Sequence, residues 1–333
     1  MRDGSVLVTG GAGYIGSHAV LALLDAGWRV VVVDNLSTGF AWAVDPRATL
    51  VQANIEDSDT VRAAMREHDV VGVMHFAGSI IVPESVTDPL KYYRNNTAAS
   101  RTLIESAVAY GVKHFVFSST AATYGAPEKV PVAEGDPTVP INPYGSSKLM
   151  TEIMLRDVAA AHPFNFAALR YFNVAGADPQ GRSGQSTAGA THLIKVAVEA
   201  ATGKRGHVSV FGTDFATPDG TGVRDYIHVS DLAAAHVEAL DLLIAQPEAN
   251  HILNAGYGRG YSVLQVLDAV DRVTNMTIER RIEGRRLGDP DALVSDNRAI
   301  LAALPWRPKH DDLDQIVTDA LAWERKLAEQ HGR

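Results

Sequence analysis

Short apolar runs rich in β-branched residues alternate with longer segments of helical periodicity along the first half of the chain. The runs predict strands at residues 6–9, 30–34, 50–53, 70–75, 114–119 and 166–170, and the segments between them predict helices at about 14–26, 58–68, 89–110 and 143–162. Some runs are apolar throughout, as strands buried on both faces of a parallel sheet are. The alternation of strands and helices therefore predicts an α/β fold with a doubly wound parallel sheet.

The pattern changes after Arg170. A polar, Gly-rich stretch at 178–189 precedes an Ala-rich helical pattern at about 191–202, a short strand pattern at 208–211 and a Gly- and Asp-rich loop at 212–222. Shorter mixed elements continue beyond this loop. We therefore expect two domains, a first one at 1–177 with a return segment near 225–250, and a smaller mixed α/β domain at 178–333.

The amino-acid composition excludes several kinds of functional site and of binding partner. The 333 residues include no cysteine, which excludes a disulfide framework, a Cys nucleophile, thiolate zinc sites and iron–sulfur clusters. The formal net charge of −9 argues against nucleic acid or an anionic membrane as a partner. The first residues do not form a signal peptide, and no stretch approaches the roughly eighteen apolar residues of a membrane span. We expect a globular cytoplasmic enzyme.

A glycine-rich turn lies between the first predicted strand and the first predicted helix. Gly10, Gly13 and Gly16 fit the pattern G-x-x-G-x-x-G, and Asp34 ends the second predicted strand. Glycines at this turn let the backbone approach a pyrophosphate, and the N-terminus of the following helix offers free N–H groups to it. An acid after the second strand binds ribose hydroxyls and repels a 2′-phosphate. The pattern therefore predicts a Rossmann site for NAD rather than NADP.

A Tyr-x-x-x-Lys pair opens the fourth predicted helix. Asn142 and Pro143 are a strong helix-start signal, and the spacing places Tyr144 and Lys148 on one helix face. A Tyr becomes a useful base only if its pKa falls, which takes roughly 4 kcal/mol for a shift from 10 to 7. A neighbouring Lys and a nicotinamide cation can each stabilise the phenolate. Hydroxyls at 118–120 could bind the substrate oxygen that reacts.

Together these motifs resemble the extended short-chain dehydrogenase/reductase family, and within it the branch that epimerises UDP-sugars at C4. The resemblance covers nearly the whole chain through the strings VTGGAGYIGSH, DNLSTG, HFAG, FSSTAATYG, NPYGSSKLM, LRYFN, DGTGVRDYIHV and GDP. It implies NAD-dependent 4-epimerisation of a UDP-hexose, UDP-glucose or UDP-galactose, in galactose metabolism. It also implies a homodimer that pairs the helices predicted at 89–110 and 143–162.

The resemblance implies a role for each matching residue. Tyr144 is the catalytic base and acid, Lys148 binds the nicotinamide ribose and lowers the Tyr144 pKa, and Thr120 completes the catalytic set. The remaining NAD-binding residues are Gly10, Gly13, Tyr14, Ile15, Gly16, Asp34, Asn35, Asn54, Ile55, Phe76, Ala77, Gly78, Asn95 with its neighbour Asn96, and Tyr171. The substrate-binding residues are Thr120, Tyr144, Asn173, His192, Leu193, Phe211 (uridine stacking), Arg224, Tyr226, Arg286 and Asp289. Arg224 and Arg286 match arginines that bind the diphosphate, a geometry suited to guanidinium groups.

The chain departs from the family pattern at four positions. Ile80 stands where some relatives keep a Lys near the NAD phosphates, Asn54 replaces an Asp that contacts adenine, and His192 replaces an Asn near the diphosphate. Leu293 occupies a position whose bulk influences whether the pocket admits a 2-acetamido group. Leu293 is neither the largest nor the smallest option, so use of a UDP-N-acetylhexosamine stays open, as does use of a UDP-uronate.

Three other functions are less favoured. A sugar-nucleotide 4,6-dehydratase needs a carboxylate pair directly after Thr120, where this chain has Ala121 and Ala122. A non-catalytic NAD-binding regulator could lose the Tyr–Lys pair, which this chain keeps. A metal enzyme is disfavoured because the twelve His are scattered without an H-E-x-x-H motif, and His228 is expected to be a structural residue at a helix entry.

Overall fold

The computed structural model describes residues 3–286 and 289–331 and contains a large parallel sheet of seven strands. Every neighbouring pair of strands is parallel, which confirms the doubly wound fold. The predicted strands agree with the observed ones to within one or two residues. In spatial order the strands are β10 (His251–Ala255), β6 (Asn165–Tyr171), β5 (His114–Thr120), β4 (Val70–His75), β1 (Ser5–Thr9), β2 (Arg29–Asp34) and β3 (Thr49–Gln52).

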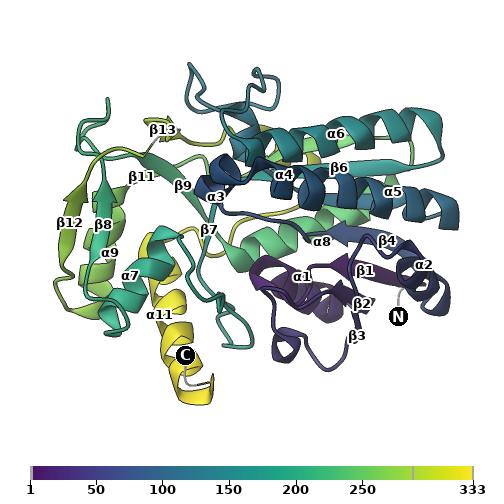
Figure 1. Cartoon of the computed structure of the whole chain (residues 1–333), viewed down its shortest axis with the longest axis horizontal. Coiled ribbons are helices and arrows are strands. Elements are labelled where there is room, and N and C mark those ends of the chain that lie inside the picture. The colour runs from purple at the N-terminus through teal and green to yellow at the C-terminus, as the bar shows by residue number, and fades with distance from the viewer. Residues whose placement is uncertain (1–2, 287–288, 332–333) are drawn as a thin grey trace.

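Helices cover both faces of this sheet (Figure 1). On one face α1 (Tyr14–Asp25) and α8 (Val229–Ala245) pack against each other and bury Val6 and Val8 of β1 and Val30 and Val32 of β2. The other face is covered by α2 (Ser58–Glu67), α5 (Ala99–Tyr110) and α6 (Pro143–Ala161). Strands buried on both sides explain the unbroken apolar runs of the sequence.

The helix predicted at 89–110 is one continuous rod with a change of pitch. It comprises α4 (Pro89–Tyr92), a π-helical stretch η2 (Tyr93–Ala98) and α5. The wider π turn contains Asn96, whose side chain turns inward and is fully hydrogen-bonded within the protein. Wider turns of this kind often mark functional sites, and this one lies beside the loop that follows β4.

Smaller sheets lie beyond the carboxyl ends of the large one, at the left of Figure 1. The central strand is β9 (Val223–His228), which pairs with β7 (Asn173–Ala175), β11 (Gly260–Ser262) and β13 (Ala292–Leu293), while β8 (Val208–Phe211) pairs with β12 (Arg280–Glu283). They pack on α7 (Leu193–Ala201), α9 (Val263–Thr274) and α11 (Leu313–His331). Shorter helices are η1 (Ala41–Ala43), α3 (Val82–Thr87), η3 (Ala121–Tyr124) and α10 (Arg298–Ala303).

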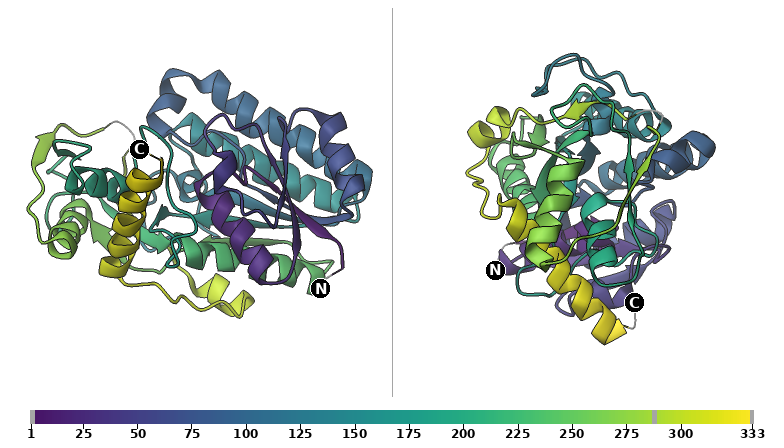
Figure 2. Two further views of the ribbon diagram at one scale, coloured as in Figure 1. Left: turned by 90° about the horizontal axis from the view of Figure 1, so that it is seen from below. Right: turned by 90° about the vertical axis from the view of Figure 1, so that its left-hand side faces the viewer.

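The chain crosses between the two regions more than once. After β9 it returns as α8 and then adds β10 to the edge of the large sheet, beside β6. The predicted return segment near 225–250 corresponds to β9 and α8, whereas the strand β10 was not predicted. The domain boundaries at 177 and 178 stay a prediction. Two further views show the second region at one end of the large sheet (Figure 2).

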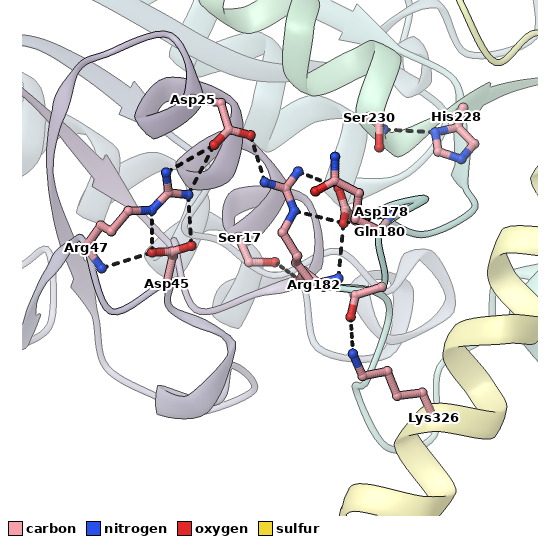
Figure 3. A network of polar contacts seen from close by, with 12 residues as sticks. Ser17, Asp25, Asp45, Arg47, Asp178, Gln180, Arg182, His228, Ser230 and Lys326 are labelled. Carbon is pink, nitrogen blue, oxygen red and sulfur yellow. Dashed lines mark hydrogen bonds and ion pairs between the residues drawn. The ribbon is translucent and has the colours of Figure 1, made fainter.

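Residues 178–187, which we call the strap, run between the two regions and are tied to both. Arg182 is central, because its Nη1 donates to Asp25 Oδ2 at the end of α1 (2.8 Å) and its Nη2 donates to Asp178 Oδ1 (2.7 Å). Asp25 also accepts hydrogen bonds from Arg47 in the loop after β2 (Figure 3).

Two further contacts fix the strap. The hydroxyls of Ser183 and Ser17, the latter in α1, are 2.7 Å apart, and Lys326 of α11 donates to the carbonyl of Gly181 (2.6 Å). The polar stretch that the sequence marks as a loop is therefore an ordered connection between the first helix and the last. None of the helices among the described residues is long and apolar enough to cross a lipid bilayer.

Candidate active site

The glycine loop brings the backbone of β1 close to that of β4. Gly10 has φ +70°, and a Cβ there would lie 2.6 Å from the backbone nitrogen of Ala77. A Cβ on Gly16 would lie 2.2 Å from the Gly10 carbonyl oxygen, so neither position admits a side chain. Gly13 caps α1 without a side-chain hydrogen bond, which leaves the first N–H groups of a twelve-residue helix free for an anion. The loop therefore fits a dinucleotide pyrophosphate.

The next two positions open α1. The hydroxyl of Tyr14 donates to the carbonyl of Gly176 in the second region (2.7 Å), and Ile15 packs against the core between α1 and the sheet. A pocket of about 200 Å³ lies beside the loop, and both the loop and the strap line it. Its lining residues include Ala12, Gly13, Tyr14, Ser17, Gly184 and Ser186.

Asp34 lies at the carboxyl end of β2, next to the glycine loop. Its Oδ2 accepts from the backbone N–H of Ala12 (3.0 Å) and its Oδ1 from that of Leu36 (2.8 Å). These bonds fix a nearly buried carboxylate where the adenosine ribose of a dinucleotide would lie. Asn35 follows, and its side chain closes a turn by accepting from the N–H of Ser37 (3.0 Å).

The other predicted cofactor residues lie along the same edge of the sheet. Asn54, after β3, accepts from the N–H of Glu56 (3.2 Å), and Ile55 beside it is buried. Phe76 follows β4 and packs on the ring of His236, with the centroids 4.8 Å apart. Asn54, Ile55 and Phe76 therefore lie at the same edge of the sheet as the glycine loop, because the carboxyl ends of neighbouring parallel strands meet at that edge.

The loop after β4 is held by the two asparagines of the π-helical turn. Asn96 accepts from the N–H of Ser79 (2.7 Å) and donates to the Ser79 carbonyl and the Ser147 hydroxyl (3.0 Å each). Gly78 has φ +158°, and a Cβ there would lie 2.8 Å from Asn96 Oδ1. Asn95 donates to the Ser79 hydroxyl (3.0 Å). All hydrogen-bonding groups of the Asn96 amide are therefore used within the protein. Asn96 supports the loop after β4 and has no group left to bind the cofactor directly.

Tyr144, Thr120 and Lys148 meet where β5 ends and α6 begins. Asn142 caps α6 by accepting from the N–H of Gly145 (2.9 Å), as the sequence predicts. The hydroxyl of Tyr144 is hydrogen-bonded to the side chain of Thr120. Lys148 Nζ donates to the carbonyl of Ser118 (2.9 Å). The structure thus brings the three predicted catalytic side chains to one strand end.

Burial is the main cause of the pKa shifts of Tyr144 and Lys148. It raises the pKa of Tyr144 above its ordinary value, a shift that the hydrogen bond from Thr120 partly opposes. Burial lowers the pKa of Lys148 to about 8. In the protein without NAD the net shift of the Tyr144 pKa is thus upward, and the contribution of Lys148 to that pKa stays a prediction. The positive nicotinamide of bound NAD⁺ would supply the missing stabilisation of a phenolate.

The two serines before Thr120 already have partners. Ser118 hydrogen-bonds the hydroxyl of Tyr171, whose pKa is raised by burial, and Ser119 donates to Glu152. Thr120 is thus the one hydroxyl of the 118–120 run that contacts Tyr144.

Sequence reasoning missed an ion pair directly behind the catalytic residues. Arg170 Nη2 and Nε donate to the carboxylate of Glu152 (2.6 and 2.9 Å), and the two side chains are only 4% and 3% exposed. Glu152 lies one helical turn beyond Lys148, so the same i,i+4 spacing that relates Tyr144 to Lys148 could have indicated it.

Four of the predicted substrate residues line one pocket in the second region. Asn173 in β7 is in register with Tyr226 in β9, and burial raises the pKa of Tyr226 to about 12. His192 and Leu193 begin α7. These four residues line an open pocket of about 400 Å³, whose inner wall includes Lys195, Trp323 and Glu324.

The predicted nucleotide anchors form a second cluster. The guanidinium of Arg286 lies over the ring of Phe211 (4.6 Å to the centroid), and its Nε donates to Asp289 (3.0 Å). Burial lowers the pKa of Arg224, and the nearby Asp289 opposes this shift. Arg224 donates one hydrogen bond to its neighbouring carbonyl, and further N–H groups stay available for an anion. Gly288 of the GDP motif lies outside the described residues.

The structure shows what surrounds Leu293 and Ile80, two positions at which the chain departs from the family pattern. Leu293 of β13 is in register with Arg224 and packs against the cluster of Ala121, Tyr124 and Val132. Ile80 is exposed in the loop after β4.

One group of side chains within the described residues has the spacing of a metal site, namely His228, His310 and Asp319. His228 caps α8, and its Nδ1 accepts from the N–H of Ser230 (3.0 Å). A neutral ring with Nδ1 occupied in this way carries its proton on Nε2, which donates to Asp319 (3.2 Å). Both nitrogens are therefore used in hydrogen bonds, and the predicted role of His228 at a helix entry is confirmed.

Comparisons with known proteins agree with this geometry. The sequence model of the NAD dependent epimerase/dehydratase family matches residues 6–256. A UDP-glucose 4-epimerase of Azospirillum brasilense is 55% identical over 98% of this chain and 94% of its own length. The UDP-glucose-4-epimerase of Stenotrophomonas maltophila, solved with bound NAD and formylated UDP-arabinopyranose, is 40% identical, with a TM-score of 0.94 over 98% of this chain and 99% of that one. The UDP-Glc/GlcNAc 4-epimerase of Campylobacter jejuni is 44% identical, with a TM-score of 0.84 over 97% and 99%.

The buried Lys148 predicts how stability depends on pH in the NAD-free protein. Its folded-state pKa of about 8 lies below the ordinary value of 10.5, so the unfolded chain binds more protons between these pH values and stability rises with pH there. Relative to a Lys148→Met variant, the wild-type free energy of unfolding should rise by roughly 3 kcal/mol from pH 8 to 10.5. Urea unfolding measures this, with Lys113→Met as the exposed control. If the difference in the free energy of unfolding between wild type and Lys148→Met did not change with pH, the lowered pKa of Lys148 would be refuted.

Proposed function

The chain belongs to the NAD dependent epimerase/dehydratase family, and from this we propose that it interconverts UDP-glucose and UDP-galactose by inverting C4 of the hexose. The observation that carries the proposal is the hydrogen-bonded pair of Tyr144 and Thr120 beside Lys148 at the end of β5. The next residue, Ala121, belongs to the cluster on which Leu293 packs, and Leu293 is in register with Arg224. We infer that this base serves both a dinucleotide at the glycine loop and a UDP-sugar held by Arg224, as an internal redox reaction requires.

The side chains divide the chemistry among them. Tyr144 takes the proton from the 4-hydroxyl of the hexose and later returns it, while Thr120 hydrogen-bonds the reacting oxygen. Bound NAD⁺ supplies a reversible acceptor for the C4 hydride. Lys148 holds the nicotinamide ribose and favours the phenolate of Tyr144. One proton and one hydride leave and return, so the reaction is an isomerisation with no net oxidant.

Inversion requires a sugar that turns while its nucleotide stays fixed. Strong anchors gather at the nucleotide end, where Arg224 and Arg286 suit the diphosphate, Phe211 the uracil and Asp289 the ribose. Asn173 and Tyr226 stand nearer the hexose and offer few charged contacts. This unequal anchoring lets the 4-keto sugar present either face to the cofactor.

A UDP-N-acetylhexosamine is the second candidate substrate. Leu293 has a side chain of middle size and packs against the cluster that contains the small Ala121. The Campylobacter jejuni relative is a UDP-Glc/GlcNAc 4-epimerase. A Leu at this position is smaller than an aromatic ring and would leave more room for a 2-acetamido group.

We also propose a homodimer through the outer face of α3, α4 and α6. Leu90 is 77% exposed, and Val86, Met150 and Ile153 are exposed on the same group of packed helices. An apolar face of this kind commonly marks a protein–protein interface. A second copy of the chain would cover it by pairing the same helices.

Replacing Tyr144 by Phe removes the proposed base but keeps the ring. Epimerisation of UDP-galactose should fall by at least about a hundredfold, because general base catalysis contributes on this order. The bound NAD, measured after denaturation, should stay unchanged. Tyr110→Phe on α5 is the control and should keep full activity. Unchanged turnover in Tyr144→Phe would refute the base, and a wild type that binds NAD without turnover would be a regulator instead.

Enlarging Leu293 should narrow the substrate range. In Leu293→Tyr, kcat/KM for UDP-N-acetylglucosamine should fall on the order of tenfold relative to that for UDP-glucose, because the larger ring takes the space of the acetamido group. Initial rates on both sugars and on UDP-glucuronate measure this. Equal loss on both hexoses would place Leu293 away from C2 of the sugar.

A charge on the proposed dimer face should separate the subunits. Leu90→Arg should halve the mass measured by light scattering after gel filtration, whereas Ile282→Arg, at an exposed apolar position in the second region, should leave it unchanged. A wild-type protein that elutes as a monomer at micromolar concentration would overturn the dimer.

A further inference from the structure

The strap connects the two regions and also places Gln185 in the pocket that the predicted substrate residues line. Gln185 is 8% exposed, and its Nε2 lies 2.8 Å from Nδ1 of His192. Gln185 lines the same 400 Å³ pocket as His192, Asn173 and Tyr226. The contact of Gln185 with His192, the N-cap of α7, is the only polar side-chain link from the described strap residues to this helix.

The hydrogen bond fixes the protonation of the imidazole. An amide nitrogen can only donate, so Nδ1 of His192 accepts the bond from Gln185 and cannot itself carry a proton. Burial lowers the pKa of His192, which keeps the ring neutral near pH 7. A neutral imidazole with a free lone pair on Nδ1 has its one proton on Nε2. The nitrogen that remains for a ligand is therefore a hydrogen-bond donor.

The charged neighbours of His192 are already paired. Lys195, one turn along α7, forms an ion pair with Glu324 of α11, and Lys204 contacts the same carboxylate (2.7 Å). The other titratable group facing the pocket is Tyr226, on β9. None of these groups is hydrogen-bonded to the imidazole, so among the described residues Gln185 alone determines which ring nitrogen holds the proton.

The strap holds Gln185 firmly on both sides. Ser183 is bonded to Ser17 of α1, and a Cβ on Gly184 would lie 2.3 Å from the ring of Trp323. The Trp323 indole N–H donates to Ser186 (3.2 Å). The glutamine thus lies between two anchored residues, and its side chain loses little further freedom on binding His192.

We propose that Gln185 is a positioning residue for the UDP-sugar: it holds His192 as a neutral ring whose Nε2–H donates to an oxygen of the sugar diphosphate. This inference rests on the proposed function and extends it, since it names the residue through which the strap acts on substrate binding. A neutral N–H donor adds a directional hydrogen bond at the anchored diphosphate without placing a further charge in this pocket.

A double-mutant cycle tests whether Gln185 acts through His192. Gln185→Leu should raise the Kd for UDP and the KM for UDP-galactose about tenfold, the usual effect of losing one buried hydrogen bond, with kcat within twofold. In a His192→Phe background the same change should have no further effect. Gln315→Leu, which removes the equivalent Gln–His bond to His310 (3.1 Å), is the matched control and should change neither constant. Additive effects in the cycle would overturn the proposal.

A second variant gives a readout that misfolding would not produce. A Glu at 185 can only accept, so in Gln185→Glu the neutral ring of His192 carries its proton on Nδ1 and turns a lone pair toward the ligand. The KM should then rise as pH increases from 6 to 9, because only the protonated ring keeps the Nε2 donor, whereas the wild-type KM should stay flat. Parallel profiles would overturn the proposal. Absence of epimerisation in the wild type would overturn the proposed function alone, because the UDP affinities still test Gln185.

Discussion

The buried ion pair between Arg170 and Glu152 holds the reactive part of the molecule together. Glu152 belongs to α6, Arg170 to β6, and Ser119 of β5 donates to the same carboxylate. One carboxylate therefore ties the helix that carries Tyr144 and Lys148 to the two strands beneath it. Removing either charge would leave its partner buried and unpaired, a far larger penalty than the loss of a surface ion pair. The geometry at the end of β5 depends on this constraint.

Desolvation shapes the chemistry that this scaffold supports. Burial raises the pKa of Tyr144 and lowers that of Lys148, so the protein alone holds both groups closer to neutrality than they are in water. A phenolate becomes accessible when a further positive charge arrives nearby. In the proposed mechanism the positive nicotinamide of NAD⁺ would lower the Tyr144 pKa, so the phenolate would be most populated when the hydride acceptor is in place.

The sequence was sufficient for the large sheet, for the glycine loop and for the start of α6, because each depends on local signals. The apolar runs require burial on both faces, Gly10 and Gly16 leave no space for a Cβ, and Asn142 caps its own helix. The partners in contacts made across the fold could not be read from such local signals. β10, the pair of Arg170 and Glu152, and the contact of Gln185 with His192 each join residues that are distant in the chain or ordinary in composition. The upward shift of the Tyr144 pKa also left no local signal, because burial is a property of the whole fold.

The anchoring of the strap also bears on how related chains can differ in length. Surface loops usually accept inserted and deleted residues. Residues 183–186 are all buried, whereas residues 188 and 189 are exposed. Ser183 contacts α1, Gly184 packs on Trp323, and Gln185 contacts His192. Adding one residue between Ser183 and Gln185 would turn the glutamine away from its histidine. Variation in chain length among relatives should therefore concentrate at 188–189, and residues 183–186 should be conserved in length as the residues of a strand are.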